Sequence, residues 1–162
     1  MDSKKYLADW YDAIGFLEQR NGGAILNGVP IPMLQTDIVD EIKNPGKEGT
    51  LDVNHIFTAM CVVVGLDEQF PYARDYTSFL RENIEDTLRA LEGKILTAVQ
   101  NDDVERVYLF AHAKEILRGS IEDRLDTTYA MEGIYNARWQ EDEGKSREDL
   151  LKEIMDRYEK II

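Results

Sequence analysis

The sequence has little of the chemistry that marks secreted, membrane-spanning or disulfide-rich proteins. Cys61 is its single cysteine, so an intramolecular disulfide is impossible and a reducing compartment is expected. Hydrophobic stretches long enough to cross a bilayer are missing, and residues 1–5 lead into a polar segment rather than a signal peptide. The sequence therefore predicts a cytoplasmic protein with no membrane partner.

Basic residues are scarce relative to acidic ones. The 162 residues include 19 lysines and arginines against 32 aspartates and glutamates, which gives a formal net charge of −13. Such a chain repels phosphate backbones, and it has no basic patch to offset that repulsion. We therefore expect no nucleic-acid partner. The charge favours solubility, and a second interpretation is a docking face for a basic partner.

Motifs for catalysis or metal binding are also missing. The chain has no Gly-rich phosphate loop, no G-x-S-x-G and no H-E-x-x-H. Asp52 and His55 have the i, i+3 spacing of half a di-iron carboxylate site, but no acid lies three positions before His112 to supply the other half. Cys61 lacks the basic, electropositive surroundings of a nucleophile, so we expect a core thiol. The sequence predicts no catalytic, cofactor-binding or metal-ligating residue.

Two pairs of acids leave one enzymatic alternative open. Glu82 with Glu85, and Glu153 with Asp156, resemble the paired acids with which all-α nucleotide pyrophosphohydrolases hold magnesium. The alternative is therefore a magnesium-dependent, nucleotide-hydrolysing enzyme, and it requires the four carboxylates to converge. Because the chain has 32 acids, such pairs also arise by chance, and a solvated surface is the favoured interpretation.

Hydrophobic periodicity predicts an all-α protein with about six to seven helices. Apolar residues recur at helical spacing along most of the chain, and Asn or Gly residues mark several helix ends. Residues 104–117 are apolar on nearly every side, so we expect this helix to be the most buried. The expected helices cover about residues 4–20, 37–43, 52–65, 84–99, 104–117, 121–140 and 146–161.

Polar residues are expected to cap three of these helices. The side-chain oxygen of an N-cap residue accepts a backbone N–H that the helix itself cannot pair. Thr36 is placed to cap the short second helix, and Ser120 with Asp123, and Ser146 with Asp149, are placed to cap the last two.

Residues 24–32 carry the β signal of the sequence. Asn27-Gly28 lies between apolar pairs, as a type I′ hairpin turn requires. Pro30 and Pro32 lack an N–H and fit only an unpaired strand edge. We expect a tiny β-hairpin or a tight loop in this segment.

An internal repeat with an offset of 40 residues is expected in the second half of the chain. Residues 86–93 resemble residues 126–133, and the apolar stripe carries over from Leu91 to Met131. Each copy reads as a long helix, a polar turn and a second helix, which predicts two stacked helical hairpins. We accordingly divide the chain into an N-terminal helical lobe, residues 1–70, and a helical-hairpin lobe, residues 71–162, packed as one unit.

Gly93 and Gly133 stand where small residues let paired helices approach closely. With these features, residues 82–162 resemble degenerate tetratricopeptide-type helical hairpins, although Glu92 and Glu132 occupy positions where that family has a large apolar residue. The resemblance implies a scaffold that binds peptides or proteins in a groove.

These observations favour a protein–protein interaction or scaffolding module without catalytic activity. Its partner would be another protein or a peptide, and no cofactor is expected. A homo-oligomeric structural protein is a further alternative, in which the apolar stripe that ends at Ile161-Ile162 pairs across a two-fold axis of a homodimer.

Overall fold

The computed structural model describes residues 1–18, 26, 28–46, 50–138 and 145–162, and these residues are predominantly helical. Helices account for 74% of them, which confirms the expected all-α class. Within the described ranges the structure has nine helices and a two-stranded sheet, more helices than the six to seven expected.

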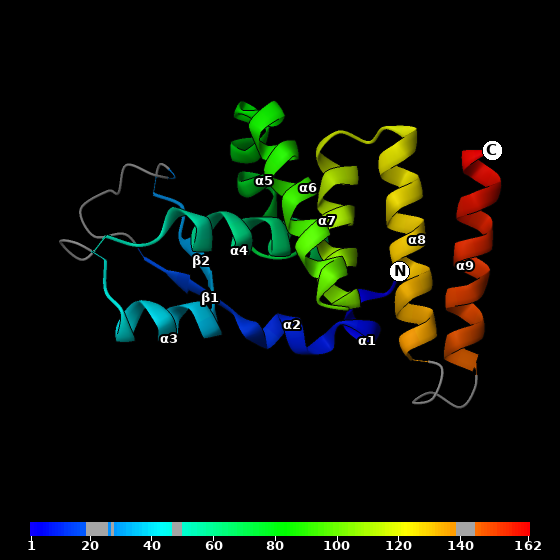
Figure 1. The fold of residues 1–162 in the computed structure, drawn as a ribbon, viewed down its shortest axis with the longest axis horizontal. Coiled ribbons are helices and arrows are strands. Elements are labelled where there is room, and N and C mark those ends of the chain that lie inside the picture. The colour runs from blue at the N-terminus through cyan, green and yellow to red at the C-terminus, as the bar shows by residue number, and fades with distance from the viewer. Residues whose placement is uncertain (19–25, 27, 47–49, 139–144) are drawn as a thin grey trace.

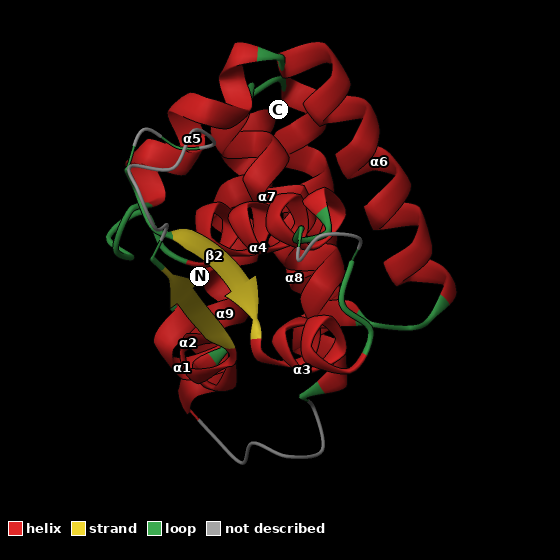
Figure 2. Cartoon of the chain, turned by 90° about the vertical axis from the view of Figure 1, so that its left-hand side faces the viewer, coloured by secondary structure: helices red, strands yellow, loops and turns green. Residues whose placement is uncertain are grey.

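Helices α7, α8 and α9 stand side by side, and α4 packs against α7 and lies beside the small sheet (Figures 1 and 2). In chain order the elements are α1 (Ser3–Tyr6), α2 (Ala8–Ala13), β1 (Ile14–Leu17), β2 (Ile31–Leu34), α3 (Gln35–Lys43), α4 (Val53–Leu66), α5 (Ala73–Glu82), α6 (Ile84–Gln100), α7 (Val104–Leu117), α8 (Ile121–Ala137) and α9 (Lys145–Ile161). None of the described helices is long and apolar enough to span a membrane.

The N-terminal segment differs from the expected helix over residues 4–20. Leu7 takes φ −129° and ψ 31°, which separates α1 from α2, and the chain becomes extended at Ile14. Residues 14–17 combine Ile and Phe, which favour strands, with Gly15, which weakens a helix. The apolar spacing of this segment fits a helix, but pairing with β2 decides its conformation.

The structure contains a small β element, as expected, but this element is not a hairpin within residues 24–32. β1 and β2 pair antiparallel, with Ile14 opposite Leu34 at one end of the ladder. The partner of β2 therefore lies before the expected turn rather than within that segment. Asn27 falls outside the described residues, whereas Gly28 has a φ of 87°, as a tight turn requires.

The predicted helix caps have different outcomes. Ser120 and Asp123 form a reciprocal capping box at the start of α8, as expected. Thr36 is not an N-cap, because α3 already begins at Gln35 and continues directly from β2. The cap assigned to Ser146 lies outside the side chains that the structure describes.

The core centres on the crossing of α4 and α7. Helix α4 buries an unbroken run over residues 59–66, so the expectation that residues 104–117 form the most buried helix is wrong. As its apolar surface predicts, α7 nevertheless contacts α4, α5, α6 and α8. Gly65 makes the crossing possible, because a Cβ there would overlap the Leu109 carbonyl oxygen.

The glycines predicted to permit close helix packing do not have that role. A Cβ on Gly93 would meet nothing within 4 Å, and one on Gly133 would lie 3.6 Å from Val104 Cγ1, an ordinary van der Waals contact. α6 packs on α7, α7 on α8 and α8 on α9, and the residues matched by the 40-residue offset, Leu91 and Met131, are both fully buried.

Candidate functional site

Helix α6 is covered mainly on one side, and its exposed flank forms one side of an apolar hollow. Of its 17 residues, Thr87, Leu91 and Ala98 are buried. Its main contact is with α7 behind it, whereas Leu96 and Val99 are 59% and 53% exposed. α6 therefore separates two sites. An apolar groove lies on its side toward α8, and a polar cleft lies on its side toward α3 and α4.

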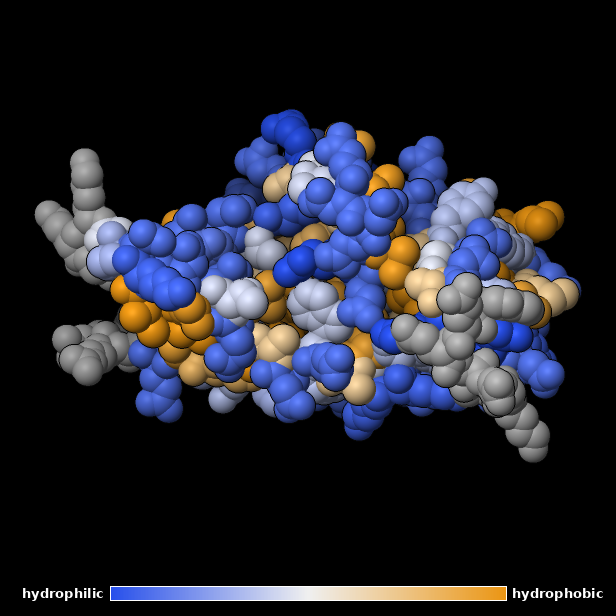
Figure 3. All heavy atoms as spheres, turned by 60° about the horizontal axis from the view of Figure 1, so that its bottom comes forward, coloured by the Kyte–Doolittle hydropathy of each residue, from blue (hydrophilic) through white to orange (hydrophobic). Residues whose placement is uncertain are grey.

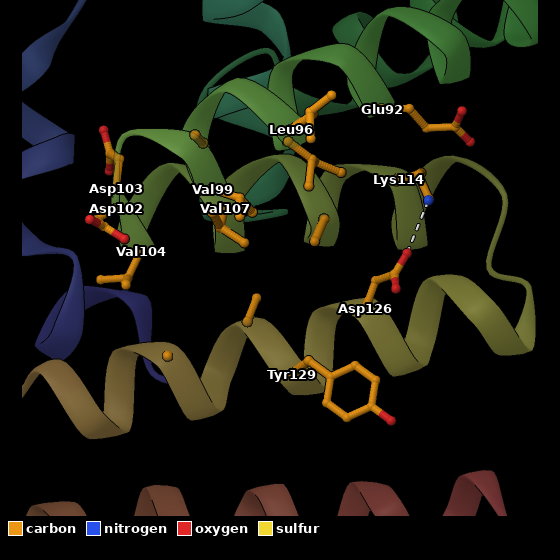
Figure 4. Close-up of a pocket in the computed structure, with 15 residues that line it drawn as sticks. Glu92, Leu96, Val99, Asp102, Asp103, Val104, Val107, Lys114, Asp126 and Tyr129 are labelled. Atoms are coloured by element: carbon orange, nitrogen blue, oxygen red, sulfur yellow. Dashed lines mark hydrogen bonds and ion pairs between the residues drawn. The ribbon is translucent and has the colours of Figure 1, made fainter.

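The apolar groove has α6 and α8 as its walls and α7 as its floor (Figure 4). Its volume is about 560 Å³, in the range of binding pockets for ligands and side chains. The larger apolar side chains that line it are Ile95, Leu96, Val99, Val104, Val107 and Tyr129. Apolar surface gathered in a concave site, rather than scattered singly, indicates a binding surface.

Small residues on the α8 wall keep the groove open. The sequence predicts an apolar stripe on α6 that runs from Ile84 to Val99, and its middle residue, Leu91, is indeed fully buried. Toward the C-terminal end of α6 the stripe faces Ala130 of α8, which has only a methyl group, and Gly133, which has no side chain, so the space between the helices is not filled. The C-terminal part of the apolar stripe on α6 is consequently left uncovered.

Carboxylates stand at both ends of the groove. Glu92 and Asp126 lie at one end, and Asp102 lies at the other (Figure 4). Lys114 is the one cation among the described residues that line the groove, and its Nζ donates to Asp126 Oδ2 at 3.1 Å. The rim is therefore acidic, in keeping with the net charge of the whole chain.

A buried ion network fixes the corner between α7 and α8. Asp123 is fully buried and accepts hydrogen bonds from Arg118 Nη2 at 2.6 Å, Arg118 Nε at 2.8 Å and the Ser120 N–H at 3.0 Å. Lys114 Nζ lies 3.5 Å from the same carboxylate. Burial alone would raise the pKa of Asp123, but the hydrogen bonds from Arg118 and Ser120 lower it to about 2. The network holds the floor and one wall of the groove in a fixed geometry.

The polar cleft on the other flank of α6 has a volume of about 450 Å³ and mixed charges. Lys94 donates to Asn54 Oδ1 at 3.1 Å and lies over the Phe57 ring, and burial lowers its pKa. Arg106 is already paired with Asp103 at 2.9 Å. The positive and negative side chains of the cleft largely offset one another. The cleft therefore indicates no particular class of ligand, whereas the groove is apolar with an acidic rim.

His55 lies in a cluster of carboxylates rather than on a bare helix surface. Its Nδ1 is 3.1 Å from Glu41 Oε1, and its Nε2 is 3.8 Å from Asp37 Oδ1. Asp52, its partner in the half-site spacing, instead caps α4 through the Asn54 N–H. Burial opposes the charged form, but Glu41 and the acids around it raise the pKa of His55 overall. No group of three or more His, Cys, Asp and Glu side chains in the described residues is arranged to hold a metal ion.

His112 and Cys61 have structural positions in the core. His112 Nδ1 lies 2.6 Å from the Gly65 carbonyl oxygen, and because a carbonyl only accepts, this nitrogen carries the proton. The imidazole also stacks on Tyr108, and burial lowers the pKa of His112. Cys61 is fully buried, and burial raises the pKa of its thiol, as expected for a core residue.

The acids of the alternative enzyme occupy separate surfaces. Glu82 ends α5 and Glu85 lies in the first turn of α6, and both are exposed. Glu153, on α9, pairs with the α-amino group of Met1, and Asp156 is exposed on the same helix. The described residues do not bring these four carboxylates into a metal-holding group.

A second exposed apolar surface lies on α3. Figure 3 shows the face that includes this helix, which is largely hydrophilic with apolar side chains gathered at one end. Val39 and Ile42 on α3 are 49% and 74% exposed. This surface belongs to one helix, whereas three helices bound the groove.

The groove residues were not identified from the sequence. Leu96 and Tyr129 lie beside apolar stripes, and this spacing is the one signal that marks them. Comparisons of the chain with protein-family models, with curated proteins and with solved structures found no significant match.

Proposed function

We propose that this protein is an interaction module without catalytic activity, and that it binds a segment of another protein in the groove between α6 and α8. The observation that carries the proposal is the exposure of Leu96, Val99 and Tyr129 around one apolar hollow. Exposing these side chains to water is unfavourable, and a partner that covered them would gain the free energy of burial.

The arrangement of the second half of the chain supports this proposal. Helices α6 with α7, and α8 with α9, are consecutive helices that pack on each other, as in two stacked helical hairpins. The resemblance of residues 82–162 to tetratricopeptide-type hairpins implies the same kind of activity, the binding of a peptide in a groove between helices. The single buried cysteine accords with a cytoplasmic location for this binding.

The experiment selects binders from a displayed library of random peptides of about 15 residues and maps the strongest one by NMR. Methyl-labelled protein would be titrated with the synthetic peptide. We expect the largest shift changes at the methyl groups of Leu96, Val99 and Val107, which line the groove. Failure to select any binder, or shift changes confined to other surfaces, would contradict the proposal.

A matched pair of variants tests the location of binding. Leu96→Asp puts a charge in the groove, whereas Met155→Asp puts the same charge on α9 at a residue with nearly the same exposure, 56% against 59%. Both positions are exposed, so both variants should fold. Leu96→Asp should reduce affinity at least tenfold, or about 1.4 kcal/mol, and Met155→Asp should not. Equal affinities for the two variants would place the binding site elsewhere.

A further inference from the structure

We infer that the occupant of the groove is an amphipathic helix that carries a basic residue at each end of its apolar stripe. This inference rests on the proposed function and adds the chemistry of the partner. It follows from the positions of two carboxylates, Glu92 and Asp102, which stand at opposite ends of the α6 wall (Figure 4).

Both carboxylates are exposed toward a partner. Within the described part of the chain, neither the Glu92 nor the Asp102 side chain forms a hydrogen bond or ion pair, although Glu92 adds to the negative field at Arg118. Their neighbours on the rim differ in this respect, because Asp126 is held by Lys114 and Asp103 by Arg106. Glu92 and Asp102 are therefore the charges that a bound cation would meet first.

The spacing of the two acids sets the spacing of the cations. They are 10 positions apart, of which eight lie within α6 and two in the turn that follows it, and ten residues of a partner helix would span about 15 Å. Leu96 and Val99 lie between them on the groove side. A helical partner would thus carry Lys or Arg residues about 10 positions apart, with apolar residues between them at i, i+3 and i+4 spacing.

The shape of the groove favours a helix over an extended strand. Its floor and walls are three helices, and Ala98, Ala111, Ala130 and Gly133 give it a lining of small residues at its centre. A helix laid along such a channel packs its larger side chains into the space that the small residues leave. An extended strand would instead need an exposed sheet edge, and the groove is built from helices.

Charge complementarity identifies the partner as basic. Among the residues that line the groove, Glu92, Asp102, Asp103 and Asp126 outnumber Lys114, so the lining has a net negative charge. The chain as a whole carries −13, which attracts a cationic segment over a longer range. Complementary charges of this kind raise the association rate and select the partner more than they raise the affinity itself.

The test compares three synthetic peptides by fluorescence anisotropy. Each has about 14 residues and the same leucine stripe, and the two positions about 10 residues apart are lysine, glutamine or glutamate. The lysine peptide should bind best, the glutamine peptide about three- to tenfold more weakly and the glutamate peptide weakest. Added salt should reduce the difference. If the glutamine or the glutamate peptide binds as well as the lysine peptide, the charge inference is wrong.

Paired neutralising variants separate this inference from the proposed function. Glu92→Gln with Asp102→Asn should remove most of the preference for lysine over glutamine ends. Asp156→Asn with Glu159→Gln, at exposed positions on α9, should retain the preference. Equal preference in both variants would overturn the inference while groove binding stands. If the wild-type protein binds none of the three peptides, the inference fails, and the library selection then decides separately whether the groove binds any segment.

Discussion

Gly65 and Gly93 are both glycines within helices, yet their surroundings are opposite. A Cβ on Gly65 would lie 2.9 Å from the Leu109 carbonyl carbon and overlap its oxygen, whereas one on Gly93 would meet nothing within 4 Å. The sequence predicts a packing role for Gly93 from its place in the repeat, but the close approach depends on the angle at which α4 crosses α7. A crossing angle is a tertiary property that local sequence does not encode.

We therefore expect the same substitution to have opposite effects at these two glycines. Gly65→Ala should force α4 away from α7 and destabilise the protein by about 3 kcal/mol or more. Gly93→Ala should stabilise it by about 0.5–1 kcal/mol, because alanine loses less conformational entropy in a helix. Thermal unfolding of both variants measures the difference. A neutral Gly65→Ala would show that the two helices are not in close contact.

Phe110 on α7 is the residue whose truncation we expect to be most costly among those predicted from the sequence. Its side chain is 3% exposed. Replacing a buried Phe by Ala typically costs about 3–5 kcal/mol out of a total of about 5–15. Chemical denaturation of Phe110→Ala should show this loss, with the exposed Glu92→Ala as a control that changes little. Equal stability of the two variants would contradict the core assignment.

Asp123 should make the stability of the protein depend on acidity. Its pKa in the folded protein is about 2, below the ordinary aspartate value near 3.8, so its contribution is present above about pH 4 and is lost as the pH falls toward 2. A shift of this size corresponds to about 2 kcal/mol. Asp123→Asn should unfold more easily at pH 7 and lose part of the acid dependence. Parallel pH profiles for the variant and the wild type would contradict this.

At the scale of whole elements, the sequence predicted α4, α6, α7 and α8 well and the N-terminal segment poorly. Helix α4 is capped by Asp52 and ends at Leu66, within one residue of expectation, because its apolar run and its cap agree. In residues 4–20 the apolar spacing fits a helix, but the antiparallel pairing of β1 with β2 makes residues 14–17 a strand instead. Helix α5, Ala73–Glu82, has no counterpart among the expected helices, because the regular apolar stripe is recognised only from Ile84 onward.

Helix α3 is held to the start of α4 by a contact that should respond to pH. Glu41 Oε1 accepts the Asp52 N–H at 2.7 Å and pairs with His55, which also faces Asp37 and Asp40. Because the pKa of His55 is raised in the folded protein, its contribution is fully present below its ordinary value near 6.5 and is lost as the pH rises through the raised value.

We accordingly expect amide exchange in α3, corrected for intrinsic rates, to become less protected as the pH rises above neutrality. Helix α9 serves as an internal reference, since it lies outside this contact. His55→Gln should remove the pH dependence in α3 and leave α9 unchanged. If protection in α3 and in α9 varies in parallel, the contact does not hold α3 in place.

At the scale of the whole molecule, the groove is a feature that no single element contains. Its lining comes from α6, α7 and α8, and it exists because α8 presents small residues to α6 where the α6 stripe is still apolar. The sequence identifies the apolar face of α6 correctly, but it cannot show that part of this face remains uncovered. The excess of acidic over basic residues, by contrast, can be read from the composition, and the rim of the groove is acidic as well.

The excess of negative charge leads to a prediction about the effect of salt on stability. A net charge of −13 means that many carboxylates repel one another in the compact state. Raising the NaCl concentration from about 10 mM to about 300 mM shortens the screening length from about 30 Å to less than 8 Å and should weaken this repulsion. The melting temperature should rise by a few degrees. A fall would mean that attractive ion pairs, rather than repulsion, dominate the electrostatics of the fold.

The buried thiol of Cys61 makes the protein its own reporter of structural opening. It is the single thiol in the sequence, it is fully shielded at the centre of α4, and burial keeps it protonated and unreactive. A thiol reagent can therefore modify the chain only in those molecules in which the core has opened around α4. Where reclosing is faster than labelling, the modification rate measures the equilibrium population of that open form, in unaltered protein and without an introduced dye.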